Sequence, residues 1–400
     1  MLIQGAKVHE KSLANTTVLL TGGGGGIGYE AAKALAWMGA NVVIAEVDRQ
    51  KGQAAERQIN ELLKSNRVLF YPIDLADQQQ IEALHSFLKS RYGFVDVIFN
   101  NATITPLGAI GDVSIADWDR SYAVNLRAPV LLTQAFLPDM LKENRGTIIF
   151  VPSSGLAPYM GAYEVFKTAQ VELCNTLAGE LASTNIRVFS IGPGLVKTDT
   201  AMRGIEKVSA LMGLCTDEFY ALNQRHMLDA EHAGTGFALS VLFAQRYNGQ
   251  EVSSIQALID AGVMDRPQDD AANAPPPEMT PGLDLEGRIA SVVQTYDEQY
   301  DGWMRRNVFE RQWVLRDFKK EVNRSADQFQ AELKRTLEMI RQGDLASLRN
   351  EKALFAQLQK YYRHQHKLML GYERDAKKRE ENSRILLGWV EELQGILDAL

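Results

Sequence analysis

The chain has 400 residues, of which 46% are apolar and 23% are charged, with a net charge of -7. This length predicts two domains or more, and the negative charge argues against a nucleic-acid partner, since phosphate binding favours a basic face. Two cysteines exclude a disulfide framework and a zinc cluster, and neither a signal peptide nor an apolar run of about 18 residues is present, so we expect a cytoplasmic protein without a membrane span.

Residues 16 to 262 alternate short apolar runs with stretches of helical period. This alternation predicts βαβ units and a parallel sheet. The runs are apolar on both faces, as strands covered by helices on two sides should be. The predicted strands are TTVLL, NVVIAEV, RVLFYPI, DVIFNNA, TIIFVPS, IRVFSIG and, more weakly, SIQALIDA.

Five successive glycines follow the first predicted strand and precede a predicted helix. In this context, bare backbone and the free N–H groups of a helix start favour a dinucleotide pyrophosphate. Ile27 is expected to pack beneath the loop, and the glycines at 23–25 fill variable positions. The sharper fit is the pattern T-G-x-x-x-G-x-G, formed by Thr21, Gly22, Gly26 and Gly28.

An acidic residue, Glu46, ends the second predicted strand. A carboxylate at this place can accept hydrogen bonds from the adenosine ribose. It would also repel a 2′-phosphate, which favours NAD over NADP. Arg49 is close enough in sequence to keep the NADP alternative open.

The segment YEVFK places Tyr163 and Lys167 on one helix face at i, i+4 spacing. A nearby ammonium lowers the pKa of a phenol, and a phenol shifted in this way can exchange a proton with an alcohol. The preceding predicted strand delivers the hydroxyls of Ser153 and Ser154.

With these motifs in order, residues of about 14 to 265 resemble the short-chain dehydrogenase/reductase family. The resemblance implies a doubly wound parallel α/β sheet, the Rossmann fold, and reversible hydride transfer between NAD(H) and a secondary alcohol or ketone. The motifs are TGGGGGIG, IDL with Asp74, NNAT at 100–103, YAVNL with Asn125, the serine pair, YEVFK, and GPGLVKT at 192–198.

The resemblance also implies a role for each matching residue. Tyr163 would be the general acid/base and Lys167 would lower its pKa and bind the nicotinamide ribose. Ser153 would hold the substrate oxygen, and Asn125 would anchor a water that leads protons to Lys167. The remaining coenzyme contacts would be Asp74 and Leu75 at the adenine, Asn101 and Ala102 on the adenosine side, and Pro193, Val196 and Thr198 at the nicotinamide.

Three departures from the family pattern concern the substrate side. Thr103 stands where a glycine is usual, and Pro152 where a first serine is common. The loop between Ser153 and Tyr163, of a kind that usually carries functional residues, is shorter than the family pattern by about three residues. Ser154 remains a possible substitute for Ser153, and we interpret Tyr159 as a wall of the substrate pocket.

Residues 200–233 form the expected substrate lid. Met, Leu, Phe and Tyr are frequent there, which indicates either an apolar or aromatic substrate or ordinary helix packing. His226 and His232 lack partners at metal-ligand spacing, so no metal site is expected.

The predicted dinucleotide-binding domain covers residues 1–264, a Pro-rich linker covers 265–282, and a helical extension covers 283–400. The extension is not part of the family pattern. It could be an oligomerisation arm, a docking unit for a partner or a membrane surface, or an accessory lid. Its tryptophans would be anchors for such contacts or its own core, and they are Trp303, Trp313 and Trp389.

The predicted function is that of an NAD(P)-dependent short-chain alcohol dehydrogenase or ketoreductase, working as a homo-oligomer, a dimer or a tetramer. The alternative is a catalytically weak dinucleotide-sensing or scaffold protein that works through its helical extension. An epimerase or dehydratase is disfavoured, because the gap from Thr198 to the last predicted strand is short.

Overall fold

The computed structural model describes residues 1–153, 158–213, 215–217, 227–265, 284–305, 308–343, 351–372 and 376–400. Within these ranges, only the backbone is described at residues 308–310, 312–313, 371–372 and 376–378. The chain forms two compact units, Met1–Arg266 and Pro267–Leu400.

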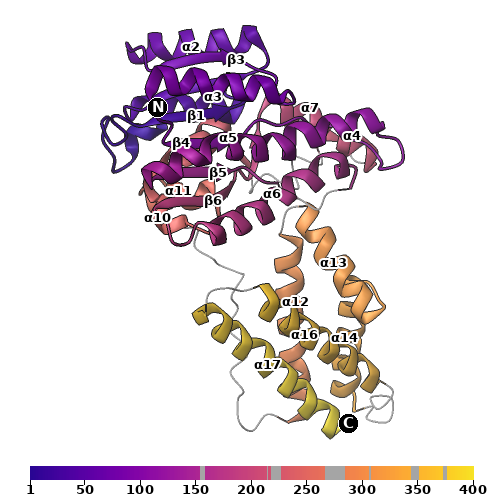
Figure 1. Cartoon of the computed structure of the whole chain (residues 1–400). Helices are drawn as coiled ribbons and strands as arrows, with labels where there is room; N and C mark the ends of the chain where they lie inside the picture. Colours follow the sequence, from indigo (N-terminus) through magenta and orange to yellow (C-terminus); the bar gives the residue numbers. More distant parts are fainter. Residues whose placement is uncertain are drawn as a thin grey trace. The chain divides into compact units, whose positions relative to one another are not determined.

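A seven-stranded parallel sheet forms the centre of the first unit (Figure 1). Its strand order is β3-β2-β1-β4-β5-β6-β9. A second, two-stranded parallel sheet pairs β7 (Leu195–Lys197) with β8 (Met227–Asp229). The main strands are β1 (Thr17–Thr21), β2 (Asn41–Glu46), β3 (Val68–Pro72), β4 (Val97–Asn100), β5 (Gly146–Phe150), β6 (Ile186–Gly192) and β9 (Glu251–Ser253).

Helices cover both faces of the large sheet, and each face has its own hydrophobic core. On one face lie α1 (Gly26–Trp37), α2 (Arg49–Leu63), α9 (Ala230–Ser240), α10 (Ala244–Tyr247) and α11 (Ser254–Asp260). On the other lie α3 (Gln78–Tyr92), α5 (Ala128–Glu143) and α6 (Gly161–Glu180). The remaining helical elements are η1 (Leu2–Gly5), α4 (Ile115–Tyr122), the π-helical turn η2 (Ala123–Arg127), α7 (Asp199–Leu211) and η4 (Val241–Phe243).

The strand order reverses beside β1, because the chain first builds outward through β2 and β3 and then continues from β4 on the other side. In doubly wound sheets, ligands bind in the crevice at the carboxyl ends of the strands at such a reversal. The predicted doubly wound fold is therefore confirmed, and its crevice lies where β1 and β4 end.

The weakly predicted last strand was wrong. Residues 254–260 form helix α11, and the seventh strand is the short segment Glu251–Ser253 just before them. The hydroxyl of Ser253 accepts the backbone N–H of Gln256 and caps this helix. Ala257 and Leu258 are fully buried in the core on the α9 side, so a helical face was mistaken for a strand.

The second unit is helical, as the sequence predicts. Its helices are α12 (Leu285–Met304), α13 (Val308–Val322), α14 (Ala326–Arg341), α16 (Lys352–Tyr372) and α17 (Ala376–Ala399). Aromatic rings fill its core: the ring of Tyr296 contacts those of Trp303, Phe318 and Phe329. Trp303 and Trp389 are buried in this core, whereas the side chain of Trp313 lies outside the described part. No described helix is long and apolar enough to cross a membrane.

Helices α1 and α9 approach closely because Gly234 has no side chain. A Cβ atom at Gly234 would lie 2.5 Å from the Cβ atom of Glu30 and 2.6 Å from the backbone nitrogen of Ala31. We predict that Gly234→Ala destabilises the protein by about 1–3 kcal/mol through overpacking. Urea unfolding followed by circular dichroism measures this change.

The matched control is Gly179→Ala in α6, where a Cβ atom would meet nothing within 4 Å. Alanine is the better helix former, so this variant should unfold at an unchanged or slightly higher urea concentration. A midpoint for Gly234→Ala at or above that of the parent protein would contradict the packing described here.

Candidate active site

Three of the predicted glycines are required by the backbone at the end of β1. Gly22 and Gly26 have φ values of +68° and +52°, in the left-handed region that glycine adopts without strain. A Cβ atom at Gly28 would overlap the carbonyl oxygen of Gly22. Ile27 packs partly buried against the core beneath the loop. The loop and the start of α1 are thus held in close contact by the absence of side chains.

The expectation that the glycines at 23–25 are merely variable holds for Gly25 alone. A Cβ atom at Gly25 would meet nothing within 4 Å, whereas one at Gly24 would lie 2.9 Å from the carboxylate of Glu46. At Gly23 it would lie 3.0 Å from the side chain of Ile44. The end of β2 stands beside the loop, so the loop has no room for side chains there.

Asn101 follows β4 and ties this strand to the glycine loop. Its side-chain nitrogen donates to the carbonyl oxygens of Thr21 at 2.9 Å and Gly22 at 3.1 Å. The hydroxyl of Thr21 accepts the backbone N–H groups of Asn101 and Ala102. The side-chain nitrogen of Asn101 therefore braces the loop, and the place of Asn101 on the adenosine side stays a prediction.

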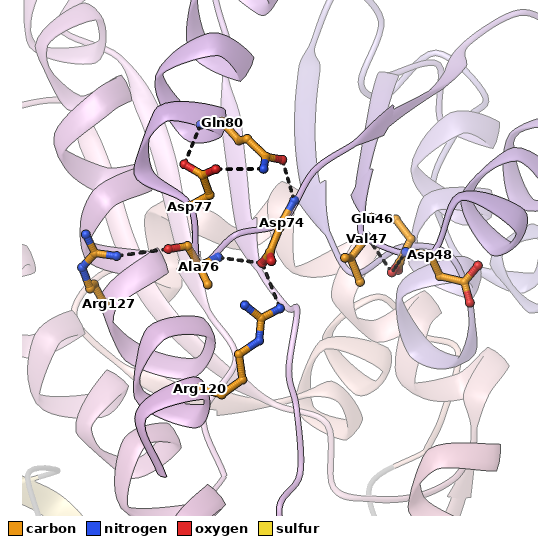
Figure 2. A network of polar contacts seen from close by, with 9 residues as sticks. All are labelled: Glu46, Val47, Asp48, Asp74, Ala76, Asp77, Gln80, Arg120 and Arg127. Atoms are coloured by element: carbon orange, nitrogen blue, oxygen red, sulfur yellow. Dashed lines mark hydrogen bonds and ion pairs between the residues drawn. The ribbon is translucent and has the colours of Figure 1, made fainter. Parts of the chain in front are cut away.

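The carboxylate of Glu46 points to the same loop. It accepts the N–H of Gly24 at 3.2 Å and, with its other oxygen, the N–H groups of Val47 at 2.9 Å and Asp48 at 3.1 Å. Figure 2 shows this carboxylate at the end of β2. The side chain of Arg49, the first residue of α2, is exposed. A fixed negative charge thus borders the crevice.

Asp74 lies after β3 in a second polar network (Figure 2). Its Oδ1 atom accepts the N–H of Ala76 and a guanidinium N–H of Arg120, both at 3.0 Å. Arg120 comes from α4 and belongs to none of the sequence motifs. Leu75 is buried next to Asp74. The carboxylate of Asp74 already forms an ion pair with Arg120. An adenine bound at Asp74, as predicted, would share this carboxylate with Arg120.

The phenol of Tyr163 and the hydroxyl of Ser153 meet, although the loop between them is short. Tyr163 lies in the first turn of α6 and is hydrogen-bonded to the side chains of Ser153 and Thr103. The loop residue Tyr159 has a φ of +67°, and its carbonyl oxygen accepts the N–H of Gly108 at 2.7 Å. Ser154 lies outside the described residues.

The pKa of Tyr163 is raised to about 12, contrary to the expected lowering by Lys167. Burial is the largest cause, and the carboxylate of Glu164 adds to it, while the hydrogen bonds to Ser153 and Thr103 act in the opposite direction. Tyr163 is therefore a neutral phenol at pH 7 in the protein without coenzyme.

Lys167 is 1% exposed, and its Nζ atom has no hydrogen-bond partner among the described residues. Burial lowers the pKa of this ammonium to about 7, and the carboxylate of Glu164 partly opposes that shift. A buried ammonium without a partner is costly. The structure thus holds a buried hydrogen-bond donor for which the described residues supply no partner.

Asn125 sits in the π-helical turn η2, and its side chain is fully used by the protein. Its Oδ1 atom accepts from the Thr103 hydroxyl and the Ile104 N–H, and its Nδ2 atom donates to the carbonyl of Ile104 and to Ser121. Its backbone carbonyl accepts from Gln170. The side chain therefore braces the segment after β4. A water at Asn125 stays a prediction, and the backbone carbonyl, which accepts a side-chain hydrogen bond from Gln170, is the atom that could hold it.

The nicotinamide end of the predicted site lies against the glycine loop. A methyl carbon of Thr198 is 3.2 Å from where a Cβ atom of Gly26 would be, and the Thr198 hydroxyl caps α7. Val196 is buried in β7, and the carbonyl of Pro193 accepts from Ser254 at 2.8 Å. The carboxyl ends of the central strands thus gather the predicted residues along one edge.

Two residues of the site were missed by sequence reasoning. Thr103 was noted only as a departure, yet its hydroxyl contacts Asn125 and Tyr163. Glu164 lies inside YEVFK, and its carboxylate accepts the Ser153 hydroxyl at 2.7 Å. Its i, i+3 spacing to Lys167 was a signal for an interaction between the two.

The histidines of the lid region carry no metal site in the described part of the chain. The ring of His232 contacts the carboxylate of Asp229 at 2.8 Å at the start of α9, and His226 lies outside the described residues.

The first unit is similar in sequence to known proteins. Residues 16–208 match the family model described as short chain dehydrogenase. The Homo sapiens protein called dehydrogenase/reductase SDR family member 4 is 36% identical over 195 residues, covering 46% of this chain and 68% of that relative. The D-beta-hydroxybutyrate dehydrogenase of Rhizobium meliloti is 31% identical over 211 residues, covering 50% of this chain and 80% of that relative.

A solved structure shares the fold. L-sorbose reductase from Gluconobacter frateurii, in complex with NADPH and L-sorbose, matches with a TM-score of 0.55 over 61% of this chain and 96% of its own, at 24% identity. Together with the identity to the two relatives and the order of the motifs, the parallel sheet and its crevice show that the chain belongs to the short-chain dehydrogenase/reductase family of oxidoreductases.

Proposed function

We propose that this protein is an NAD-dependent oxidoreductase that transfers a hydride between a secondary alcohol or ketone and the nicotinamide, with Tyr163 as general acid/base. The observation that carries the proposal is the meeting of the Tyr163 phenol with the Ser153 hydroxyl, one helical turn before the buried ammonium of Lys167. Such a phenol and hydroxyl can hold one substrate oxygen between them.

The residues at the crevice fit a dinucleotide. The close approach at Gly22, Gly24 and Gly28 leaves bare backbone at the start of α1, where a pyrophosphate would bind. The unpartnered Nζ atom of Lys167 would donate to the hydroxyls of the nicotinamide ribose. When bound, the coenzyme supplies the hydride acceptor, and its oxidised ring carries a positive charge.

The protein's own residues would handle the proton. Tyr163, with its pKa raised to about 12, is ready to donate a proton to a ketone oxygen. To act as a base on an alcohol, it needs its pKa lowered, and positive charge near the phenol does this. Ser153 would hold the same oxygen after its hydroxyl turns away from Oε1 of Glu164, to which it donates without substrate. Asn125 would keep Thr103 and the chain after β4 in place.

Glu46 supports NAD over NADP as the preferred coenzyme. Its carboxylate is fixed by three backbone N–H groups at the end of β2, where it would accept from the ribose and repel a 2′-phosphate. The distant structural relative L-sorbose reductase was solved with NADPH, so the NAD preference proposed here is drawn from Glu46 and not from this relative.

The substrate proposed is an apolar or aromatic secondary alcohol. The relative from Rhizobium meliloti is named for D-beta-hydroxybutyrate, which is itself a secondary alcohol. In α7, at the expected lid, Met202 and Leu211 are exposed and could cover an apolar substrate. Assembly as a dimer or tetramer and a cytoplasmic location complete the proposal.

The first test is turnover of NAD and NADP with a panel of secondary alcohols, including cyclohexanol and 1-phenylethanol. We predict NAD-dependent turnover that Tyr163→Phe lowers by about 10²–10⁴-fold, the range of general acid–base contributions. Tyr159→Phe, which removes the neighbouring phenol, should keep most of the activity. Tight NAD binding without turnover would favour the sensing or scaffold alternative instead.

The second test concerns coenzyme choice. Glu46→Ser removes the carboxylate, so NAD should bind about tenfold more weakly and the discrimination against NADP should shrink, as expected for the loss of a charged hydrogen bond. Asp48→Ser is the control, because serine can still cap α2. Isothermal titration calorimetry measures the Kd of NAD and of NADP for the parent protein and the two variants. Unchanged NAD/NADP selectivity in Glu46→Ser would contradict the role of this carboxylate.

The third test uses the buried charge of Lys167. Its pKa falls from 10.5 to about 7 on folding, so between these pH values the unfolded chain binds a proton that the folded protein does not. The stability contribution of this site is therefore lowest below pH 7 and rises with pH up to about 10.5, by about 1.4 kcal/mol per pH unit at most.

Without coenzyme, we expect Lys167→Met to raise the Tm at pH 6 and to raise it less at pH 9. Differential scanning calorimetry at the two pH values measures this. Lys142→Met, at an exposed position, should give the same Tm shift at both. A lower Tm for Lys167→Met than for the parent protein at pH 6 would show that burying the Lys167 ammonium does not destabilise the folded protein.

A further inference from the structure

An ion pair stands after β3, next to Glu46. Glu46 and Pro72 are register partners in the parallel pair of β2 and β3, and the N–H of Ile73 donates to the carbonyl oxygen of Glu46 at 3.0 Å. Asp74 is the next residue, and its carboxylate pairs with the guanidinium of Arg120 from α4 (Figure 2). The ion pair therefore lies at the same edge of the sheet as Glu46, one strand further from β1.

The order of the strands places this ion pair where the base of a dinucleotide would lie. The bare backbone that suits a pyrophosphate follows β1, and the carboxylate of Glu46, which suits a ribose, ends β2. Strand β3 comes next in the sheet. In adenosine, the phosphate and the base are attached at opposite ends of the ribose. A base attached to a ribose at Glu46 would thus extend towards the end of β3.

Both members of the ion pair keep hydrogen-bonding atoms for a ligand. Oδ1 of Asp74 accepts from the N–H of Ala76 and from Nη2 of Arg120, whereas Oδ2 accepts no hydrogen bond from a described residue. Arg120 uses Nη2 alone towards the described chain, so Nε and Nη1 can donate elsewhere. The two side chains are 35% and 44% exposed. An acceptor and a donor are thus offered next to each other at this edge of the sheet.

Adenine matches this pattern of donor and acceptor. On its edge that faces away from the ribose, the amino group at C6 donates and N1 accepts. Hypoxanthine, with an oxygen at C6 and a hydrogen on N1, presents the opposite pattern. The ion pair has no net charge, so it suits a neutral ring better than a phosphate. Val47, which directly follows Glu46, is 61% exposed and offers an apolar surface at the same edge.

Resting on the proposed function, we propose that Arg120 determines coenzyme specificity by donating to N1 of adenine, while Asp74 accepts from the amino group at C6. Each residue would use a hydrogen-bonding atom that the ion pair leaves free, so the contact between Asp74 and Arg120 is kept. The base would then be recognised by its edge, through a residue of α4 that belongs to none of the sequence motifs.

A second arginine provides the matched control. Arg127 lies in η2 and donates to the carbonyl oxygen of Ala76 at 3.2 Å and to Oε1 of Gln78 at 3.3 Å (Figure 2). It braces the same loop after β3 without a hydrogen bond to Asp74. Arg127→Met therefore removes a charge and a support of this loop, whereas Arg120→Met also removes the proposed contact to the base.

The experiment measures the Kd of NAD and of nicotinamide hypoxanthine dinucleotide, its deaminated analogue, by isothermal titration calorimetry of the full-length protein. We expect the parent protein to bind NAD at least about tenfold more tightly than the analogue, as for hydrogen bonds to charged groups. Arg120→Met should weaken NAD binding about tenfold and binding of the analogue less than about threefold. Arg127→Met should weaken both by the same factor and keep the preference.

The ratio of the two Kd values separates recognition of the base from mere support of Asp74. An Arg120 that only holds Asp74 in place would weaken both dinucleotides equally, so an unchanged preference in Arg120→Met overturns the proposal. A guanidinium that serves the 2′-phosphate of NADP would cost more NADP affinity than NAD affinity when it is removed, and this result also overturns the proposal.

The parent protein supplies a readout that does not depend on how the variants fold. In etheno-NAD, a two-carbon bridge blocks both the amino group and N1 of the adenine. Etheno-NAD should bind at least about tenfold more weakly than NAD. Equal Kd values for NAD, etheno-NAD and the hypoxanthine analogue would rule out recognition of this edge.

The two proposals fail in different ways, because one concerns binding and the other turnover. A parent protein that prefers NAD to the analogue but turns over no alcohol contradicts the proposed function and leaves the role of Arg120 in place. Turnover that is lost in Tyr163→Phe, together with equal binding of NAD and the analogue, overturns only the role of Arg120. A parent protein that binds no dinucleotide contradicts both.

Discussion

The site depends on an ammonium that the fold removes from water. Lys167 lies on the buried side of α6 with no hydrogen-bond partner in the described chain, and burial alone would drive it to its neutral form. The groups around Lys167 are arranged to offset this loss of solvation. Glu164 supplies a compensating negative charge, and we propose that a hydroxyl of the coenzyme accepts from Nζ.

The short loop before α6 leaves the contact between Ser153 and Tyr163 intact because α6 itself holds the serine. The Ser153 hydroxyl donates to the carboxylate of Glu164, and the Thr168 hydroxyl donates to the carbonyl of Ser153. The serine is therefore fixed by the helix that carries the tyrosine. The loop also includes Tyr159, whose positive φ is strained for a residue with a side chain. Two side chains of α6, Glu164 and Thr168, thus hold the serine on the helix that carries Tyr163.

Much of this could be predicted from sequence, because periodic burial and ordered motifs are local signals. The parallel sheet and the glycine pattern follow from periodicity and spacing. Spacing also places Tyr163 and Lys167 on the same helix, but Lys167 is not among the groups that shift the pKa of Tyr163. The sequence could not predict the close approach at Gly24, nor that the side chains of Asn101 and Asn125 are used in hydrogen bonds within the protein. These contacts depend on which backbone groups lie beside the ends of β2 and β4 in the folded chain. The expected direction of the Tyr163 pKa shift was wrong, because burial, which spacing does not show, raises this pKa and the carboxylate of Glu164 adds to the rise.

The central claim is that the buried Nζ atom of Lys167 finds its missing hydrogen-bond partner in a dinucleotide that lies along the carboxyl ends of the strands. A crystal structure of the protein with NAD tests this most directly. The account predicts that Nζ lies within hydrogen-bond distance of the nicotinamide ribose, with the pyrophosphate over the glycine loop and the adenosine ribose at Glu46. A dinucleotide bound elsewhere, or a Lys167 still without a partner in the complex, would contradict it.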